Sequence, residues 1–139
     1  MKYMYHKNNQ CIIVSKNTKK VINKSCLSIV KLMCKKALFD YDSRVALTKK
    51  YCHINVKIPI YIDEYTLLIP TKSPKLYETV WINYYKIYKI EKNKQNSIIT
   101  FNDLDTLELN LSYHLLIKGF NNAKRVNTYL TSSSCMDNV

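Results

Sequence analysis

The chain has 139 residues, which suffice for one domain and are too few for two domains of ordinary size. Hydrophobic residues make up 47% of the chain, enough for a packed core, and no apolar run approaches the roughly 20 residues that span a bilayer. The formal net charge of +12 favours a polyanion as partner, because each neutralised phosphate releases counterions.

Strand-type segments follow one another along much of the chain, separated by turns that contain Asn, Asp and Pro. One or two strands are expected within 51–62, which Pro59 interrupts. The other expected strands are 11–14, 66–69, 81–90, 97–101 and 106–111. A polar turn separates 81–90 from 97–101, so these two segments predict a β-hairpin. About six short strands at this spacing favour an antiparallel sheet or sandwich.

Two segments have the periodicity of amphipathic helices. In 25–36 the apolar residues Leu27, Val30 and Cys34 are three and four positions apart. Ser112 can cap the first turn of a second helix, whose apolar face consists of Leu116, Phe120, Ala123, Val126 and Leu130. The expected fold class is therefore α+β and mainly antiparallel β, with a C-terminal helix over about 112–130 and a shorter helix near 25–36.

The positive charge is distributed unevenly along the chain. Residues 1–36 carry nine lysines and no acid, residues 71–100 carry six lysines against two glutamates, and residues 101–139 carry three bases against four acids. Codon bias of an AT-rich genome would spread lysine evenly, so it does not explain the two basic segments. We expect these segments to form one continuous cationic surface. Nucleic acid is the favoured partner, and an anionic membrane surface or a solvated face without a partner are the alternatives.

Several lysines cluster in sequence around Arg44, one of only two arginines in the chain. Lysine contacts phosphate without reading sequence, whereas arginine can enter the narrow minor groove of A·T tracts. Arg44 is therefore the candidate for sequence readout, and an ordinary surface arginine is the alternative interpretation. The other candidate DNA-binding residues are Lys35, Lys36, Lys49, Lys50, Lys57, Lys72 and Lys75.

Aromatic residues alternate with lysines between Trp81 and Lys89. Tyr84, Tyr85 and Tyr88 could stack on exposed bases, as the aromatic residues of single-strand-binding proteins do. In a sheet, however, alternate aromatic residues face the core, and this structural interpretation is favoured.

The cysteines are odd in number and form no C-x-x-C pair, which argues against a disulfide framework. A zinc site formed by Cys34, Cys52 and His53 would match no known ligand spacing. We interpret the cysteines as small buried hydrophobic residues of a cytoplasmic protein, since no export signal is visible at the start of the chain. They are Cys11, Cys26, Cys34, Cys52 and Cys135.

Catalytic motifs are absent from the sequence. One glycine cannot build a phosphate-binding loop, and the three histidines are far apart. Two weaker candidates are Cys52 with His53 as nucleophile and base, and a metal site formed by Asp103, Asp105 and Glu108. Neighbouring strand residues point to opposite faces, and carboxylates at a turn commonly face water. We therefore expect no enzyme activity, no metal and no other cofactor.

An ordered series of short motifs runs from residue 34 towards the C-terminus, beginning with Cys34, Tyr41 and Arg44. The clearest motifs are Pro59-Ile60-Tyr61-Ile62-Asp63, Leu67 to Pro70-Thr71, Ser73-Pro74, Trp81-Ile82, Ile99-Thr100-Phe101, Leu107-Glu108-Leu109 and Ser112-Tyr113. In this order and spacing they resemble the ComK family, the competence transcription factors of low-GC Gram-positive bacteria. The resemblance is clearest over 34–130.

This resemblance implies a single ComK-like DNA-binding domain over 1–139 that activates competence, or DNA-uptake, genes. The protein would bind AT-rich boxes in double-stranded DNA largely through the minor groove, with more than one subunit on a promoter and without a cofactor. The implied partners also include RNA polymerase and a Clp protease adaptor that holds the protein level down. No membrane partner is implied, and the expected location is the cytoplasm.

The sequence departs from the family pattern in several places. Residues 1–33 match it poorly, the glycine before Arg44 is missing, and Asp40 and Asp42 would repel phosphate nearby. Family members also usually continue further after the last helix. The first alternative function is therefore a shortened or diverged paralogue that acts as a regulatory or interaction protein. The second is a basic nucleic-acid binder without sequence preference.

Overall fold

The computed structural model describes residues 1–132. Its helices are α1 (Cys26–Lys36), α2 (Tyr41–Cys52) and α3 (Tyr113–Thr131), with a short 3-10 helix, η1 (Tyr84–Lys86). Its strands are β1 (Tyr3–Lys7), β2 (Gln10–Ser15), β3 (Thr18–Ile22), β4 (Ile60–Asp63), β5 (Thr66–Pro70), β6 (Trp81–Asn83), β7 (Ile87–Asn93), β8 (Asn96–Phe101) and β9 (Thr106–Leu109). Within these residues no helix has the length and apolar character that crossing a membrane requires.

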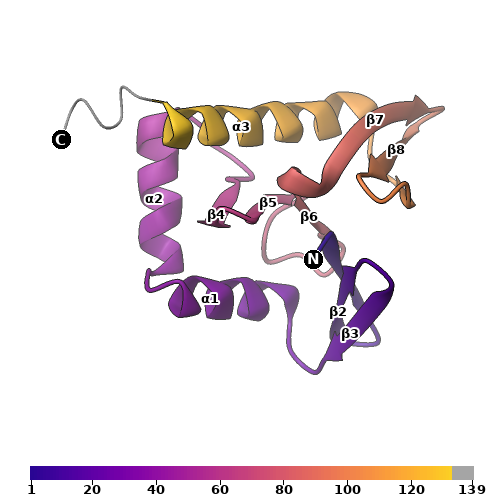
Figure 1. Ribbon diagram of the computed structural model, residues 1–139, viewed down its shortest axis with the longest axis horizontal. Helices are drawn as coiled ribbons and strands as arrows, with labels where there is room; N and C mark the ends of the chain where they lie inside the picture. Colours follow the sequence, from indigo (N-terminus) through magenta and orange to yellow (C-terminus); the bar gives the residue numbers. More distant parts are fainter. Residues whose placement is uncertain (133–139) are drawn as a thin grey trace.

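Two antiparallel sheets form the framework of the molecule. The larger sheet has the order β3-β2-β1-β6-β5-β4, and the smaller sheet has the order β7-β8-β9. The pairs Tyr3–Ile82 and Met4–Trp81 join the N-terminal ribbon of β1, β2 and β3 to the rest of the larger sheet. Figure 1 shows α1, α2 and α3 framing β4 and β5 on three sides, with β7 and β8 on the side away from α2.

Helix α1 covers one face of the larger sheet. Its buried side chains Val30 and Cys34 belong to a core cluster with Met4, Leu68 and Trp81. The helix begins where the Ser25 hydroxyl accepts a hydrogen bond from the backbone N–H of Ser28 at 3.1 Å, an N-cap that satisfies one free donor of the first turn.

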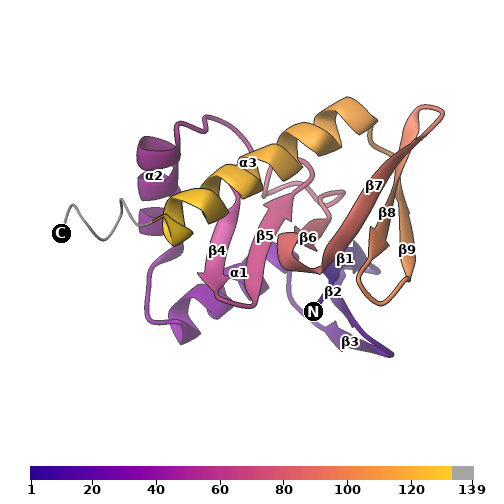
Figure 2. The same cartoon turned by 45° about the horizontal axis from the view of Figure 1, so that its top comes forward.

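Helix α3 covers the opposite face, and Figure 2 shows it lying across β4 and β5. Ala123 and Val126 pack with Leu67 and Ile69 of β5. Leu68, between them in sequence, points to the α1 side, because successive strand side chains alternate between the faces of a sheet. Leu67, Leu68 and Ile69 are all buried, because helices cover both faces of this strand.

Helix α2 stands beside β4, the edge strand of the larger sheet, and connects the two helical layers (Figure 1). It buries only Thr48 and Cys52, so it contributes little to the core. Its position covers an edge whose backbone groups would otherwise be open to pairing with another chain.

The structure confirms the predicted fold class, α+β with antiparallel sheets and a C-terminal helix. The strands predicted at 11–14, 66–69, 97–101 and 106–111 correspond to β2, β5, β8 and β9, and β7 and β8 form the predicted hairpin. The helix predicted near 25–36 is α1. Ser112 caps α3 as predicted, accepting from the backbone N–H of Leu115 at 3.3 Å.

Two strand predictions hold only in part. Within 51–62 only Ile60–Asp63 is a strand, and the segment begins with the last two residues of α2. The expected strand at 81–90 is interrupted by η1, because the Asn83 side chain accepts a hydrogen bond from the backbone N–H of Tyr85 and turns the chain. Three further elements, α2, β1 and β3, were not predicted from the sequence.

Candidate nucleic-acid interface

The predicted DNA-binding lysines lie on several elements. Lys35 and Lys36 end α1, Lys49 and Lys50 end α2, and all four are exposed. The negative end of a helix dipole stabilises such cations, which explains both pairs without a ligand. In Figure 1 the end of α1 is next to the start of α2, and the end of α2 is next to the end of α3. The two lysine pairs therefore lie at opposite ends of α2.

The remaining predicted lysines lie in loops. Lys57 is half-buried between α2 and β4, with a left-handed backbone φ of 49°. Lys72 and Lys75 belong to the loop between β5 and β6, where Lys72 lines a hollow that also contains Glu78. The structure thus divides the predicted set among the end of α1, α2 with the loop that follows it, and the β5–β6 loop.

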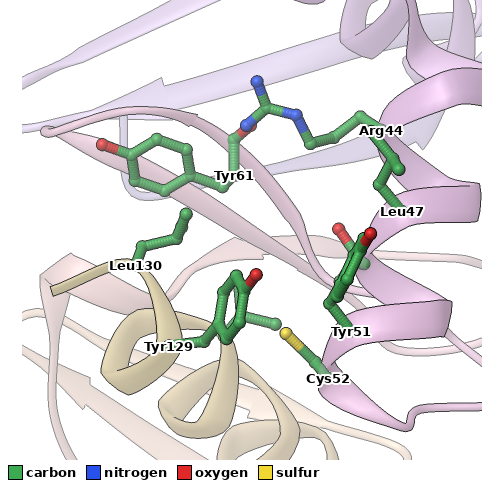
Figure 3. Close-up of a pocket in the computed structure, with 9 residues that line it drawn as sticks. Arg44, Leu47, Tyr51, Cys52, Tyr61, Tyr129 and Leu130 are labelled. Carbon is green, nitrogen blue, oxygen red and sulfur yellow. The ribbon is translucent and has the colours of Figure 1, made fainter. Parts of the chain in front are cut away.

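The protein itself holds Arg44. Its Nη1 donates a hydrogen bond to the backbone carbonyl of Tyr61 at 3.1 Å, and its guanidinium carbon lies 3.8 Å from the centroid of the Phe39 ring. Figure 3 shows the side chain reaching from α2 towards Tyr61. The hydrogen bond connects α2 to the edge strand β4, and the cation–π contact connects α2 to the loop that precedes it. No local pattern reveals this structural role, because Tyr61 lies 17 residues from Arg44 in the chain.

The two acids near Arg44 serve the start of α2. Asp40 is the N-cap of this helix, and its Oδ2 accepts from the backbone N–H of Ser43 at 3.0 Å and from the Ser43 hydroxyl at 3.2 Å. Asp42 lies in the first turn, where the helix dipole stabilises a negative charge. Both carboxylates remain exposed beside Arg44.

Arg125, the second arginine of the chain, binds the other end of α2. Its Nη1 donates to the backbone carbonyls of Cys52 and His53, both at 3.3 Å. These carbonyls belong to the end of the helix, where no intrahelical donor is available. Arg125 therefore connects α3 to α2, and both arginines help to hold α2 in place.

An apolar hollow of about 320 Å³ separates α2 from the end of α3 beside Arg44 (Figure 3). The rings of Tyr51 and Tyr129 stack in it with their centroids 6.2 Å apart, and Leu47 and Leu130 are partly exposed at its rim. This lining suits apolar contact and does not suit a phosphate backbone.

The single continuous cationic surface that was expected is not found on one side of the molecule. Lys19 is directly opposite Val14 and Lys20 is directly opposite Ile13, so these neighbours point to opposite faces of β3. Lys89 and other lysines of 71–100 belong to the smaller sheet. The positive charge is therefore distributed over both sides of the larger sheet.

Exposed lysines of the first 36 residues were omitted from the predicted set, although the signal was visible. Residues 1–39 contain no Asp or Glu, so these lysines have no acid near them in sequence. The predicted set begins at Lys35 because the family motifs begin at residue 34. The exposed lysines of this region, apart from Lys35 and Lys36, are Lys7, Lys16, Lys19, Lys20, Lys24 and Lys31.

Two acids of the candidate metal cluster bind a lysine instead. Lys2 Nζ lies 3.0 Å from Asp103 Oδ2 and 2.7 Å from Asp105 Oδ2. The hydrogen bond from Lys2 lowers the pKa of Asp103 below its ordinary value. Among residues 1–132 no group of three or more His, Cys, Asp or Glu side chains is arranged to hold a metal ion.

Two of the three tyrosines proposed to stack on bases pack against α3. Tyr84 contacts the ring of Phe120 at a centroid distance of 5.0 Å, and the Tyr85 hydroxyl donates to Asn127 Oδ1 at 2.7 Å. Burial raises the pKa of both hydroxyls. Of these three tyrosines Tyr88 alone is exposed, so the structure does not bring the rings together as a stacking platform.

The cysteines within residues 1–132 are buried, as predicted. Cys11 Sγ and Cys26 Sγ are 2.7 Å apart in the core between β2 and α1. Burial raises the pKa of the Cys34 thiol, which disfavours the reactive thiolate. Cys135 lies outside the described residues.

A model of the ComK family, described as ComK protein, matches residues 1–134 of the chain. The chain belongs to the ComK family. The match includes residues 1–33, where the sequence analysis recognised no motif, and it therefore covers the N-terminal ribbon as well as the helices. Neither a curated protein nor a solved structure matches the chain significantly.

Membership of the ComK family implies a role in competence transcription through DNA binding. The family consists of transcription factors and not of enzymes. This agrees with the interpretation of the charge as suited to a polyanion.

Proposed function

We propose that this ComK-family chain acts in the cytoplasm as a single DNA-binding domain that activates competence genes. Its proposed targets are AT-rich boxes in double-stranded DNA, recognised sequence-specifically and largely through the minor groove. More than one subunit binds a promoter and acts on RNA polymerase, and a Clp protease adaptor controls the protein level. The proposal includes no enzyme activity and no cofactor.

The family match over residues 1–134 carries this proposal. The net charge of +12 supports it, because duplex DNA is a dense polyanion whose counterions are released on binding. The ion pairs recorded among residues 1–132 engage only Lys2 and Lys89 of the basic residues. Many exposed lysines therefore remain available for phosphate.

A gel-shift titration on two duplexes, one with paired A/T tracts and one without them, tests the proposal at two salt concentrations. Preference for the A/T-tract duplex that persists at the higher salt is the expected result. Strong binding only at low salt, without preference, would instead indicate a non-specific nucleic-acid binder. Absence of binding at both salt concentrations would indicate an interaction protein that has lost DNA binding.

Arg44 remains the proposed readout residue, and its test must allow for its structural contacts. Arg44→Ala is expected to reduce discrimination between the two duplexes when equal amounts of folded protein, measured by circular dichroism, are compared. Arg125→Ala is the matched control, because it also removes hydrogen bonds that hold α2. If both variants lose discrimination equally, Arg44 acts through the fold and not by reading DNA. Lys49→Ala should weaken binding to both duplexes about equally.

A further inference from the structure

The N-terminal part of the fold carries lysines and no acid of its own. Residues 1–39 form β1, β2, β3 and α1. Every lysine in this part except Lys2 is exposed, and none belongs to an ion pair recorded within residues 1–132. Which of these lysines lie on the same side is decided by strand register and helix periodicity.

The strand register places Lys20 on the side of α1. Lys20 is directly opposite Ile13 of β2, and Ile13 is directly opposite Met4 of β1. Residues paired in this way point to the same face of the sheet. Met4 and Ile13 pack in the cluster that contains the inner side of α1. Lys20 therefore projects from the α1 side of β3, the strand at the end of the sheet.

Helix α1 turns two more lysines away from the core. Its inner face consists of the buried residues Cys26, Ile29, Val30 and Cys34. With about 100° between successive residues, Lys31 and Lys35 lie on the opposite side of the helix, one turn apart. Both are exposed. The helix has 11 residues and is therefore about 16 Å long.

Two further lysines lie at the start of α1. Lys24 directly precedes Ser25, the N-cap of the helix. Lys75, from the β5–β6 loop, lines a small hollow together with Ser25. A row of lysines thus follows α1 from the edge strand β3 towards α2. We call it the basic face, and it consists of Lys20, Lys24, Lys31, Lys35 and Lys75.

Acids close in sequence to the basic face lie after α1 and in the β5–β6 loop. Asp40 and Asp42 lie beyond the end of α1, and Asp40 is already bonded to Ser43. Glu78 lies in the same loop as Lys75. Lys31 Nζ lies 5.6 Å from the ring centroid of Tyr41. This cation–π contact stabilises the positive charge of Lys31 without neutralising it.

We propose that the basic face is the surface that contacts the phosphate backbone of duplex DNA. This inference rests on the proposed function and specifies it. Lysine is suited to phosphate contacts that fix the position and orientation of a protein on the duplex. Lys49 and Lys50 lie outside the basic face, and the proposal predicts that they contribute less to binding.

The test compares two variants that lose the same charge. The first is Lys20→Gln/Lys24→Gln/Lys31→Gln/Lys35→Gln in the basic face. The matched control replaces four lysines that are also exposed, lie on other parts of the fold and were not predicted to bind DNA, Lys92→Gln/Lys94→Gln/Lys118→Gln/Lys124→Gln. Duplex affinity is measured by fluorescence anisotropy over a salt series, and the folding of each variant is checked by thermal melting.

The basic-face variant should bind the A/T-tract duplex at least about 30-fold more weakly, and the slope of log K against log salt should flatten by about 3 to 4, because each phosphate contact contributes about 0.9. The control should lose less than about threefold. If the basic-face variant does not fold, Lys20→Gln/Lys24→Gln and Lys31→Gln/Lys35→Gln are each expected to weaken binding by about fivefold.

Two results would overturn the inference in different ways. An equal or larger loss in the control, with tight binding by the unaltered chain, would show that DNA binding takes place at another surface. Failure of the unaltered chain to bind either duplex would refute the proposed function itself, and the basic face would lose its assignment with it.

Discussion

Asn83 is an almost fully buried polar residue that joins three parts of the chain. Its Oδ1 accepts hydrogen bonds from the backbone N–H groups of Leu67 at 3.1 Å and Tyr85 at 3.2 Å. Its Nδ2 donates to the carbonyls of Met1 at 3.0 Å and Tyr65 at 2.9 Å. The side chain thus fixes the N-terminus against β5 and starts η1. Both acceptor sites of Oδ1 and both N–H donors of Nδ2 are therefore used by the backbone.

We predict that Asn83→Asp destabilises the fold by about 3 kcal/mol or more. The change removes both Nδ2 donors, leaves two carbonyls without a partner and brings a charge into the interior. Urea unfolding at neutral pH measures the effect. Asn110→Asp, at an exposed position, is the control and should change the free energy of unfolding little. A loss below about 1 kcal/mol for Asn83→Asp would show that the hydrogen bonds around Asn83 are dispensable.

Lys2 is the second buried polar residue with a decisive role, since its ammonium group binds Asp103 and Asp105. Burial lowers the pKa of Lys2, but the hydrogen bonds and charges of the two carboxylates outweigh it and hold that pKa above the ordinary 10.5. The hydrogen bond from Lys2 holds the pKa of Asp103 below the ordinary 3.8. Both groups therefore remain charged over the whole range between these values.

These pKa shifts predict the direction of a pH effect. The depressed pKa of Asp103 contributes stability that is present above pH 3.8 and is lost as the pH falls through the folded-state pKa. The raised pKa of Lys2 contributes stability below pH 10.5 that is lost as the pH rises through its folded-state pKa. The melting temperature of Lys2→Met should therefore fall less between pH 5 and about pH 3 than that of the unaltered chain. Lys7→Met, at an exposed lysine, should keep the full fall. Equal falls in all three proteins would contradict this coupling.

At the scale of elements, burial pattern decided which segments could be predicted from sequence. The run Leu67 to Ile69 is apolar throughout because β5 is covered on both faces, and the spacing of Leu116, Ala123 and Val126 matches the buried stripe of α3. Helix α2 has no such stripe, since only Thr48 and Cys52 are buried. It is held by its caps and by contacts with arginines, which periodicity does not reveal.

Gly119 lies where α3 comes close to β5. A Cβ atom added there would lie 3.1 Å from Ile69 Cγ2, which is tighter than an ordinary van der Waals contact. Ile69 is itself buried between the helix and the sheet, so it has little room to move. Glycine costs the helix about 1 kcal/mol relative to alanine. The close approach of the two elements explains why that cost is tolerated at this position.

We predict that Gly119→Val destabilises the fold by about 2 to 3 kcal/mol, because a branched side chain would push α3 away from β5. Asn121→Val, on the exposed side of the same helix, is the control for the effect of a β-branched residue on helix propensity and should cost about 0.5 kcal/mol or less. Denaturant unfolding compares the two. Equal losses would mean that the helix–sheet distance at Gly119 is not limiting.

At the scale of the whole molecule, the class of partner could be predicted from the sequence better than the protein surface that would bind it. The charge of +12 and the motifs after residue 34 pointed to a DNA-binding family, to which the chain belongs. Arg44 was chosen because it is one of two arginines, yet its contacts with Phe39 and Tyr61 depend on tertiary structure. The basic face likewise depends on the register of β3 and the orientation of α1, which no local pattern encodes.

The two edges of the larger sheet are protected in different ways. Helix α2 stands beside β4, and Arg44 donates a hydrogen bond to the backbone carbonyl of Tyr61 on that strand. Strand β3 pairs only with β2 in the described part of the chain, so its outer backbone groups face solvent. Lys19, Lys20 and the exposed Val21 lie along it. Charged side chains on an edge strand oppose pairing with a second sheet.

We therefore predict that Lys19→Val/Lys20→Val makes the protein associate through β3. The substitutions add β-branched side chains to an open edge and remove the charges that keep copies apart. Light scattering coupled to size-exclusion chromatography should show a mass that rises with protein concentration, whereas Lys49→Val/Lys50→Val, with the same loss of charge on α2, should keep the mass of the unaltered chain. If both variants associate to the same extent, the cause is the lower net charge of the molecule and not the edge of the sheet.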